Sequence, residues 1–173
     1  MLRRFRSDGS GIGAVEFALI APFMLLAILG SFQVFAFARA RMLTVAAARN
    51  LADLISQQDG VTTSELADFC KAGKLSLLPL ASSTFKASIA SVSYSGSLRK
   101  IDWTDTSCGV VAAITNAANT ATSVTPTAGD SAIVVAASYA YSSPLTFPIS
   151  LNVTFTATAL ARPRSGTAVT YGS

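Results

Sequence analysis

The chain has 173 residues, of which 51% are hydrophobic and only 13% are charged, with a net charge of +4 at neutral pH. Soluble globular proteins usually carry about twice that share of charged residues, so we expect part of the chain to lie in lipid. The absence of histidine removes the commonest general base and the commonest metal ligand. Composition therefore argues against an enzyme, a bound cofactor, a metal site and a small-molecule substrate, and the scattered basic residues argue against nucleic acid.

An uncharged apolar segment occupies residues 17–38, after a short polar leader that contains Arg3, Arg4 and Arg6. A helix of that length rises about 33 Å, which is enough to cross a hydrocarbon core of about 30 Å. We therefore predict a cytoplasmic leader over residues 1–11 and a transmembrane helix over residues 12–38, because basic flanks tend to stay in the cytoplasm. Three arginines also follow the apolar segment, so the orientation rests equally on the cysteines beyond it, which could pair in an oxidising compartment.

The residues alone leave three fates open for this segment. The small residues Ala36 and Ala38 allow a signal-peptide cut that leaves Arg39 first, although the apolar stretch is longer than a cleavable signal needs. The helix can also be an uncleaved anchor, with Glu16 marking where the membrane begins. In the third case a cut after Gly11 leaves an ammonium group on Ile12, one helical turn from the Glu16 carboxylate, so that the two charges neutralise each other within or between chains.

The residues around this third cut resemble a known family. A basic leader that ends in Gly11, with Glu16 and Phe17 as the fifth and sixth residues after the cut, is similar to the processing site of type IV prepilins. The segment GAVEFALIAPFMLLAILG resembles the TadE-like pseudopilins of the tight-adherence (Tad/Flp) pilus machinery. The resemblance implies that a prepilin peptidase cuts between Gly11 and Ile12, and that Glu16 pairs with the amino terminus of an adjoining subunit.

The same resemblance implies a location and a set of partners. The protein would be a single-pass protein of the bacterial inner membrane, with its carboxyl-terminal domain in the periplasm and with a place beside the pilus after assembly. Its partners would be the prepilin peptidase, other Tad pilins and pseudopilins, the inner-membrane assembly platform and membrane lipid. Its role would lie in pilus assembly, secretion, surface adhesion and biofilm formation. The alternatives are an uncleaved, membrane-anchored binding or adhesin module and a secreted enzyme released at Ala38.

The residues after the apolar segment predict a helical stalk over residues 39–58 and an extracytoplasmic α+β domain over residues 59–173. Apolar side chains recur in the stalk at steps of three and four residues, which lays one stripe along a helix face; they are Leu43, Ala47, Leu51, Leu54 and Ile55. The stripe can form the core of the domain or a surface for other subunits. We expect the helix to end at Asp59 and Gly60, because glycine tolerates the left-handed conformation at a helix terminus.

Local patterns predict the elements of the domain. Thr62 to Glu65 has the sequence of a capping box that opens a short helix, and the alanine-rich residues 110–121 predict another. Alternating apolar residues predict strands over 86–95, 98–103, 133–141 and 149–159. Polar residues on one face of these strands predict an antiparallel sheet that is solvated on that face and packs against the stalk on the other. The predicted fold class is α+β: a long amino-terminal transmembrane helix that continues into a stalk and packs on a small antiparallel sheet, as in pilins.

The cysteines and the acidic residues of the domain are the remaining candidates for a site. Cys70 and Cys108 either form one disulfide, which the oxidising compartment favours, or remain as two buried thiols. The spacing of Asp102, Asp105 and Asp130 fits no known calcium loop, so we expect these carboxylates to lie in solvated turns.

Overall fold

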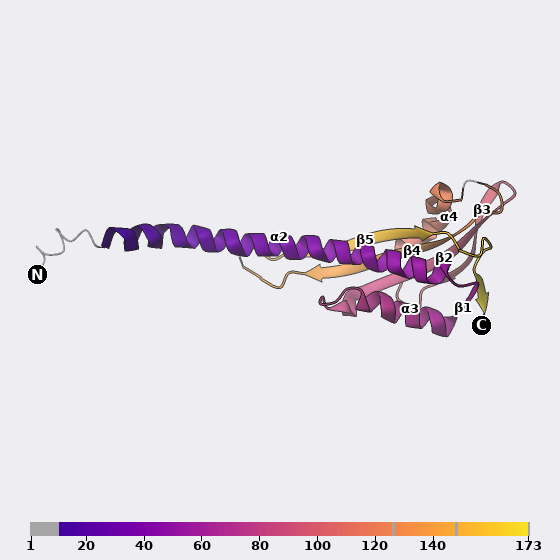
Figure 1. The fold of residues 1–173 in the computed structure, drawn as a ribbon, viewed down its shortest axis with the longest axis horizontal. Helices are drawn as coiled ribbons and strands as arrows, with labels where there is room; N and C mark the ends of the chain where they lie inside the picture. The colour runs from indigo at the N-terminus through magenta and orange to yellow at the C-terminus, as the bar shows by residue number, and fades with distance from the viewer. Residues whose placement is uncertain (1–10, 126, 148, 173) are drawn as a thin grey trace, which may run out of the picture.

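The computed structural model describes residues 11–125, 127–147 and 149–172, and the leader residues 1–10 lie outside this described part. The molecule is elongated (Figure 1), and helix α2 (Ile12–Ser56) extends along most of its length. The amino-terminal half of α2 projects alone, whereas its carboxyl-terminal half lies against a sheet. The predicted fold class, a long apolar helix packed on a small antiparallel sheet, is confirmed.

The sheet has four antiparallel strands in the order β3-β2-β4-β5. They are β2 (Phe85–Ser95), which follows the 3₁₀ turn η2 (Ser82–Thr84), β3 (Leu98–Asp105), β4 (Ser131–Ser142) and β5 (Asn152–Ala161). All four predicted strands are present, but β5 begins at Asn152 rather than at Ile149. Residues 149–151 belong to the connection from β4 instead, in which the carbonyl groups of Leu145 and Ile149 accept hydrogen bonds from the side chain of Gln33 in α2.

Helix α2 covers one face of the sheet and packs against β4 and β5. Alternate residues of β4 form this inner face, from Ile133 to Tyr141, and all of them are buried. The stalk stripe belongs to the same core, because Ala47, Leu51 and Ile55 have no exposed surface. The stripe is therefore not a surface left free for other subunits.

The opposite face of the sheet is not uniformly solvated. The prediction of a solvated face was therefore wrong for the end of the sheet that lies far from the projecting, amino-terminal half of α2. Ala132, Val134 and Ala136 of β4 are buried there. Short helical turns cover them, contributing Ile114 and Ala117 to a second apolar cluster. The wet face that the sequence indicated is restricted to the rest of the sheet, where β5 exposes its threonines.

These turns replace the single helix predicted over residues 110–121. They are η3 (Ala112–Asn116), α4 (Ala117–Thr120) and η4 (Ala121–Ser123). The hydroxyl groups of Thr115, Thr120 and Thr122 donate hydrogen bonds to carbonyl groups three or four residues earlier. Such side-chain bonds compete with regular helical pairing, which accounts for a chain of short turns in an alanine-rich segment.

Helix α3 (Thr63–Leu75) lies beside α2 and begins with the predicted capping box, which is confirmed. The Thr62 hydroxyl accepts from the backbone N–H of Glu65, and the Glu65 carboxylate accepts from the backbone N–H of Thr62. Close packing of the two helices depends on Gly73, because a Cβ atom there would lie 2.8 Å from Cδ1 of Leu51.

A two-stranded parallel sheet at the end of α2 was not predicted. It joins β1 (Gly60–Thr62) to β6 (Thr170–Gly172), near the carboxyl end of the described chain. Helix α2 ends at Ser56, and Gly60 is not its left-handed cap, since its φ angle is not positive. Gly60 matters for another reason, because a Cβ atom there would lie 2.6 Å from Oγ1 of Thr170 and would displace that side chain.

Cys70 of α3 and Cys108, which follows β3, are joined by a disulfide with their Cα atoms 5.7 Å apart. The bridge therefore ties α3 to the segment that leaves the sheet. It closes a loop with a sequence separation of 38, for which loop-closure entropy predicts a stabilisation of about 4 kcal/mol.

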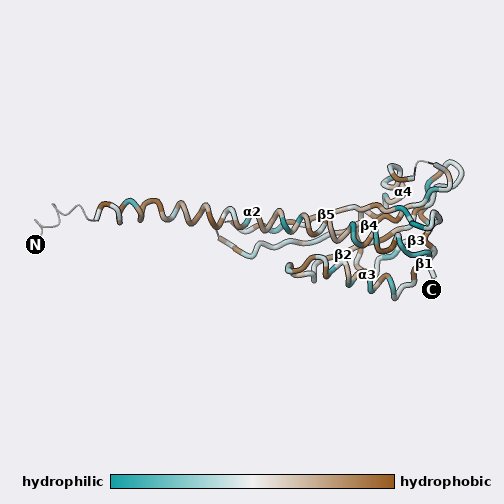
Figure 2. The backbone as a smooth tube through the Cα atoms, in the orientation of Figure 1, coloured by the Kyte–Doolittle hydropathy of each residue, from teal (hydrophilic) through white to brown (hydrophobic). Residues whose placement is uncertain are grey.

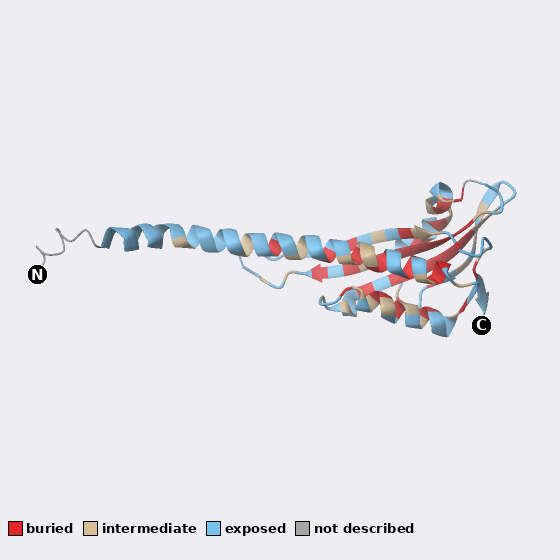
Figure 3. Ribbon diagram, viewed as in Figure 1, coloured by how far each residue is buried: buried red, intermediate tan, exposed pale blue. Residues whose placement is uncertain are grey.

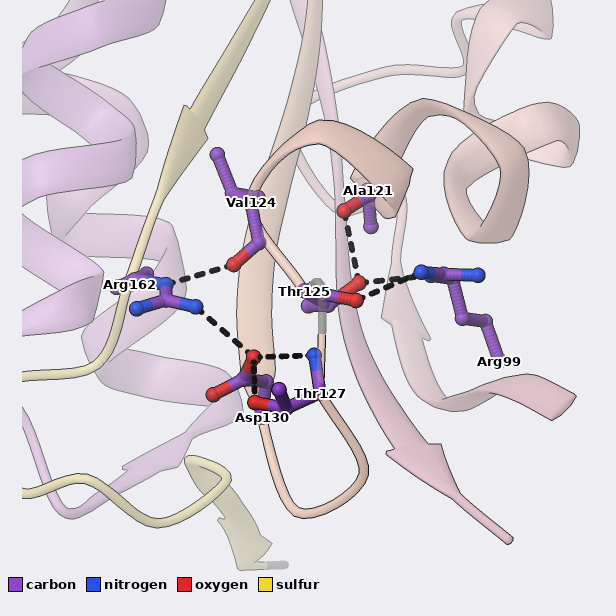
Figure 4. Close-up of polar contacts among 7 residues, drawn as sticks. All are labelled: Arg99, Ala121, Val124, Thr125, Thr127, Asp130 and Arg162. Carbon is purple, nitrogen blue, oxygen red and sulfur yellow. Dashed lines mark hydrogen bonds and ion pairs between the residues drawn. The ribbon is translucent and has the colours of Figure 1, made fainter. Parts of the chain in front are cut away.

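Two arginines hold the segment between η4 and β4 against the sheet (Figure 4). Arg99 of β3 donates to the carbonyl oxygen and hydroxyl of the buried Thr125, at 2.7 and 2.9 Å. Arg162, which follows β5, donates to Val124 O at 2.6 Å and pairs with Asp130 at 2.9 Å. The Thr127 backbone N–H and hydroxyl also donate to Asp130, and these bonds, with Arg162, lower the pKa of the Asp130 carboxyl below its usual value.

This lowered pKa predicts an acid-sensitive contribution to stability. The ionised Asp130 stabilises the fold above the pKa of an unfolded aspartate, about 4, and this contribution is lost as the pH falls through the lower folded-state pKa. We expect Asp130→Asn to reduce the free energy of unfolding at pH 7 and to converge with the wild type in strong acid. Urea titration at several pH values, followed by fluorescence of the sole tryptophan, measures this. Asp102→Asn is the control, and equal pH profiles for Asp130→Asn and wild type would contradict the assignment.

Candidate functional site

No residue of α2 before Gln33 is buried by the rest of the described protein (Figure 3). We call this amino-terminal part of the helix the bare half of α2. Its side chains are mostly apolar (Figure 2) and exposed, with Phe17 at 69% and Phe23 at 71% of their full surface. An 18-residue window of α2 has a mean hydropathy of 2.3, and none of that window is buried. A soluble domain would leave such a surface in water at a large free-energy cost, whereas a bilayer removes that cost.

The residues of the predicted processing site lie together at the start of this bare helix. Gly11 is the residue just before α2, and Ile12 is the first residue within it. Glu16 and Phe17 follow one turn later and are exposed. No other described part of the protein covers the Gly11–Ile12 peptide bond, and a Cβ atom built on Gly11 meets no atom within 4 Å. The bond is therefore accessible to an external protein without unfolding of the domain.

Glu16 has no basic partner at ion-pair distance within residues 11–125, 127–147 and 149–172. It lies four residues after Ile12, so the two positions share one face of α2 and are separated by one turn, about 6 Å. This geometry suits a pair between the Glu16 carboxylate and an ammonium group on residue 12. It suits equally a pair with the amino terminus of a neighbouring chain, because the surroundings of Glu16 are open.

Pro22 lies inside α2, close to the processing residues. Proline cannot donate the backbone hydrogen bond that position 22 would otherwise make to the preceding turn, yet α2 is continuous from Ile12 to Ser56. The bare half therefore contains one weakened turn, between Glu16 and the region where the domain begins.

The bare half of α2 ends at a polar contact that the sequence did not reveal. The side-chain amide of Gln33 is buried and donates to the carbonyl oxygens of Leu145 at 2.9 Å and Ile149 at 2.8 Å. These acceptors belong to the connection between β4 and β5, which lies more than 100 positions away in the sequence. An isolated glutamine in the apolar segment was the one available signal, but it carried no information about its partner.

The acidic residues of the domain serve local structural roles. Asp102 accepts a hydrogen bond from Ser93, Asp105 accepts from the backbone and hydroxyl of Ser107, and Asp130 pairs with Arg162. The three carboxylates do not converge, and the described residues contain no cluster of three acidic or cysteine side chains that could hold a metal ion.

These features define an α+β protein, and among the residues that the structure describes one helix, α2, is long and apolar enough to anchor it in a membrane. Residues 11–53 match the model of the TadE-like protein family, which confirms the resemblance seen in the sequence and is consistent with a protein of Tad pilus systems. The match runs from the residue before α2 to three residues before its end, so it covers the helix and not the sheet. No curated protein and no solved structure matches the chain.

The Gln33 contact predicts a specific loss of stability. Gln33→Leu keeps the side chain at similar size but leaves the carbonyl groups of Leu145 and Ile149 without their donor, which costs about 1–3 kcal/mol when such groups are shielded from water. We expect a lower free energy of unfolding in detergent, together with faster hydrogen exchange at the Ser143 amide, which donates to Leu151 O at the base of the connection.

Ser31→Ala is the matched control for Gln33→Leu, because the Ser31 hydroxyl bonds only to the carbonyl of Ala27 within α2. It should leave both measurements unchanged. Equal stability of the Gln33→Leu variant and the wild type would contradict a structural role for the amide.

Proposed function

We propose that this protein is a TadE-like pseudopilin of a tight-adherence pilus system. An inner-membrane prepilin peptidase cuts the chain between Gly11 and Ile12. The processed protein stays in the membrane through α2, with its α+β domain in the periplasm, and acts in pilus assembly and surface adhesion. It performs no chemistry of its own. Its partners are the peptidase, other Tad pilins and pseudopilins, the assembly platform and the lipid around α2.

The single observation that carries this proposal is the order of residues at the start of α2. The order is that of a prepilin site, in which a basic leader is followed by Gly11, Ile12, Glu16 and Phe17. The family match also begins at residue 11. The exposure of these residues supports the proposal further, because a peptidase within the membrane can reach them while the domain remains folded. Separation of the cut from the packed half of α2 also means that removal of the leader leaves the core intact.

The disulfide supports the proposed orientation. Disulfides such as the one between Cys70 and Cys108 persist in the periplasm and are rare in the cytoplasm, which supports a domain outside the cytoplasm. Arg3, Arg4 and Arg6 would then remain on the cytoplasmic side with the leader. The peptidase cut falls at the cytoplasmic end of α2, where the leader is accessible.

The first test changes the residue before the cut. We expect Gly11→Ala to accumulate as full-length precursor, because a methyl group at this position meets nothing in the protein itself and so acts only in the peptidase site. Gly13→Ala is the matched control, since a Cβ atom there is equally free of contacts, and it should be processed normally. Immunoblotting of membranes with and without the peptidase gene separates the two forms.

Amino-terminal sequencing of the mature wild-type protein decides between the three fates of the leader. Ile12 as the first residue supports the pseudopilin. Met1 would support an uncleaved binding or adhesin module, and Arg39 would support a secreted protein; either result would overturn the proposal.

The second test concerns the charge of Glu16. We expect Glu16→Gln and Glu16→Val to be cut normally but to be defective in pilus assembly, because neither variant can neutralise an amino-terminal ammonium group. Electron microscopy and sheared-pilus yield measure assembly, and an immunoblot checks processing in the same cells. Normal piliation in Glu16→Gln would exclude the ion pair, while a defect in Glu16→Val alone would point to side-chain shape rather than charge.

A further inference from the structure

The connection between β4 and β5 extends further along α2 toward its bare half than any other described part of the domain (Figure 1). We call its described residues, 143–147 and 149–151, the β4–β5 loop. An amide NH₂ group has two protons, and those of Gln33 bind Leu145 O and Ile149 O at 2.9 and 2.8 Å. The Ser143 backbone N–H donates to Leu151 O at 2.8 Å and closes the base of the loop. The position of the loop along the helix is therefore fixed by hydrogen bonds.

The loop presents apolar side chains to its surroundings. Phe147 is 64% and Ile149 is 63% exposed. On α2, the neighbours of Gln33 in sequence, Val34 and Phe35, are also largely exposed. Residues 131–161 contain no charged side chain. An uncharged surface thus continues from the bare half of α2 onto the loop, and its exposed polar side chains are small hydroxyl groups, those of Ser31, Thr146 and Ser150.

The length of α2 determines the depth of this surface in a bilayer. Residues 12–32, which precede the contact, rise about 31 Å as a helix, and this matches a hydrocarbon core of about 30 Å. Residues 12–38, the transmembrane helix predicted from the sequence, would rise about 40 Å and exceed it. Because the loop lies beside Gln33, a hydrocarbon core that begins at Ile12 would end where the loop begins.

The first charged residue of α2 after Gln33 is Arg39, and its position relative to the loop matches that of lipid headgroups relative to acyl chains. Arg39 is exposed and lies six residues after Gln33, about 9 Å further along α2. Headgroups and the interfacial region add about 5–8 Å on each side of the hydrocarbon core, so Arg39 reaches lipid phosphates when Phe147 lies at the end of the acyl chains. Irregular backbone is not tolerated in the hydrocarbon itself, which places the loop in the interface.

We propose that the β4–β5 loop is a second membrane contact, which inserts Phe147 and Ile149 into the interface of the periplasmic leaflet beside α2. The lipid surface is the partner, recognised by an apolar tip with a basic residue above it. Two contacts, one through α2 and one through the loop, fix the tilt and rotation of the domain relative to the membrane, which a single helix cannot do. This proposal rests on the proposed membrane insertion of α2.

Depth-dependent quenching tests the proposal on the full-length protein in phosphatidylethanolamine and phosphatidylglycerol vesicles. The fluorophore NBD is attached to Phe147→Cys, and the vesicles contain lipid with a doxyl quencher near the headgroup or deep in the acyl chain. We expect the shallow quencher to cause the larger loss of fluorescence. Phe147 is exposed, so its replacement does not disturb the core, and mass spectrometry checks that the Cys70–Cys108 bridge persists.

Two matched positions make each outcome decisive. Leu98 is exposed and pairs with Ser95, at the end of the sheet opposite the β4–β5 loop. The label on Leu98→Cys should show no quenching by either lipid. Phe23→Cys, in the bare half of α2, should be quenched most by the deep lipid. If Phe23 is quenched and Phe147 behaves like Leu98, the loop proposal fails while membrane insertion stands. If Phe23 is not quenched, the insertion of α2 fails and the loop proposal with it.

A protein partner at the loop gives a different result. If Phe147 reports an apolar environment that depends on the protein-to-lipid ratio and is insensitive to both quenchers, another copy of the chain covers the loop. That result would also overturn the proposal.

Discussion

Contact between residues 40–56 of α2 and strands β4 and β5 positions everything else in this protein. Ala40, Ala47 and Ala48 have no exposed surface, and their small side chains allow the helix backbone to lie close to the sheet, while Leu51 and Ile55 fill the core beyond them. Because α2 is one continuous helix, this contact also sets the direction in which its bare half leaves the domain. The bare half of α2 is thus a continuous helical extension of the domain core.

Separate links bind segments distant in sequence to this core. The disulfide holds α3 to the segment after β3, the β1–β6 pair returns the carboxyl-terminal residues to the end of α2, and Arg99 and Arg162 fix the segment before β4. The Gln33 amide acts at the opposite end, where the domain meets the bare helix. A buried polar group there is stable because its protons are satisfied by carbonyl groups, and it fixes the position along α2 at which the domain begins.

The proposed processing residues could be placed together from the sequence because they occupy a short, continuous stretch of one helix. Gly11, Ile12, Glu16 and Phe17 need no tertiary contact to come together, since helical geometry alone places positions 12 and 16 one turn apart. The capping box at Thr62 and the strands that became β2, β3 and β4 were predictable for the same reason. Their patterns are local, and the period of apolar side chains reports directly on which face is buried.

The sequence by itself determined that a long apolar helix precedes an α+β domain, because hydropathy and periodicity are properties of consecutive residues. Only the tertiary structure decided that Gly60 lies against Thr170 and does not cap a helix. The same holds for the short turns that cover the second face of β4 and for the hydrogen bonds from Gln33 that hold the β4–β5 loop. Each of these depends on a pairing between residues far apart in the chain. The free energy of such a pairing depends on the relative position of whole elements, and no local pattern of side chains records it.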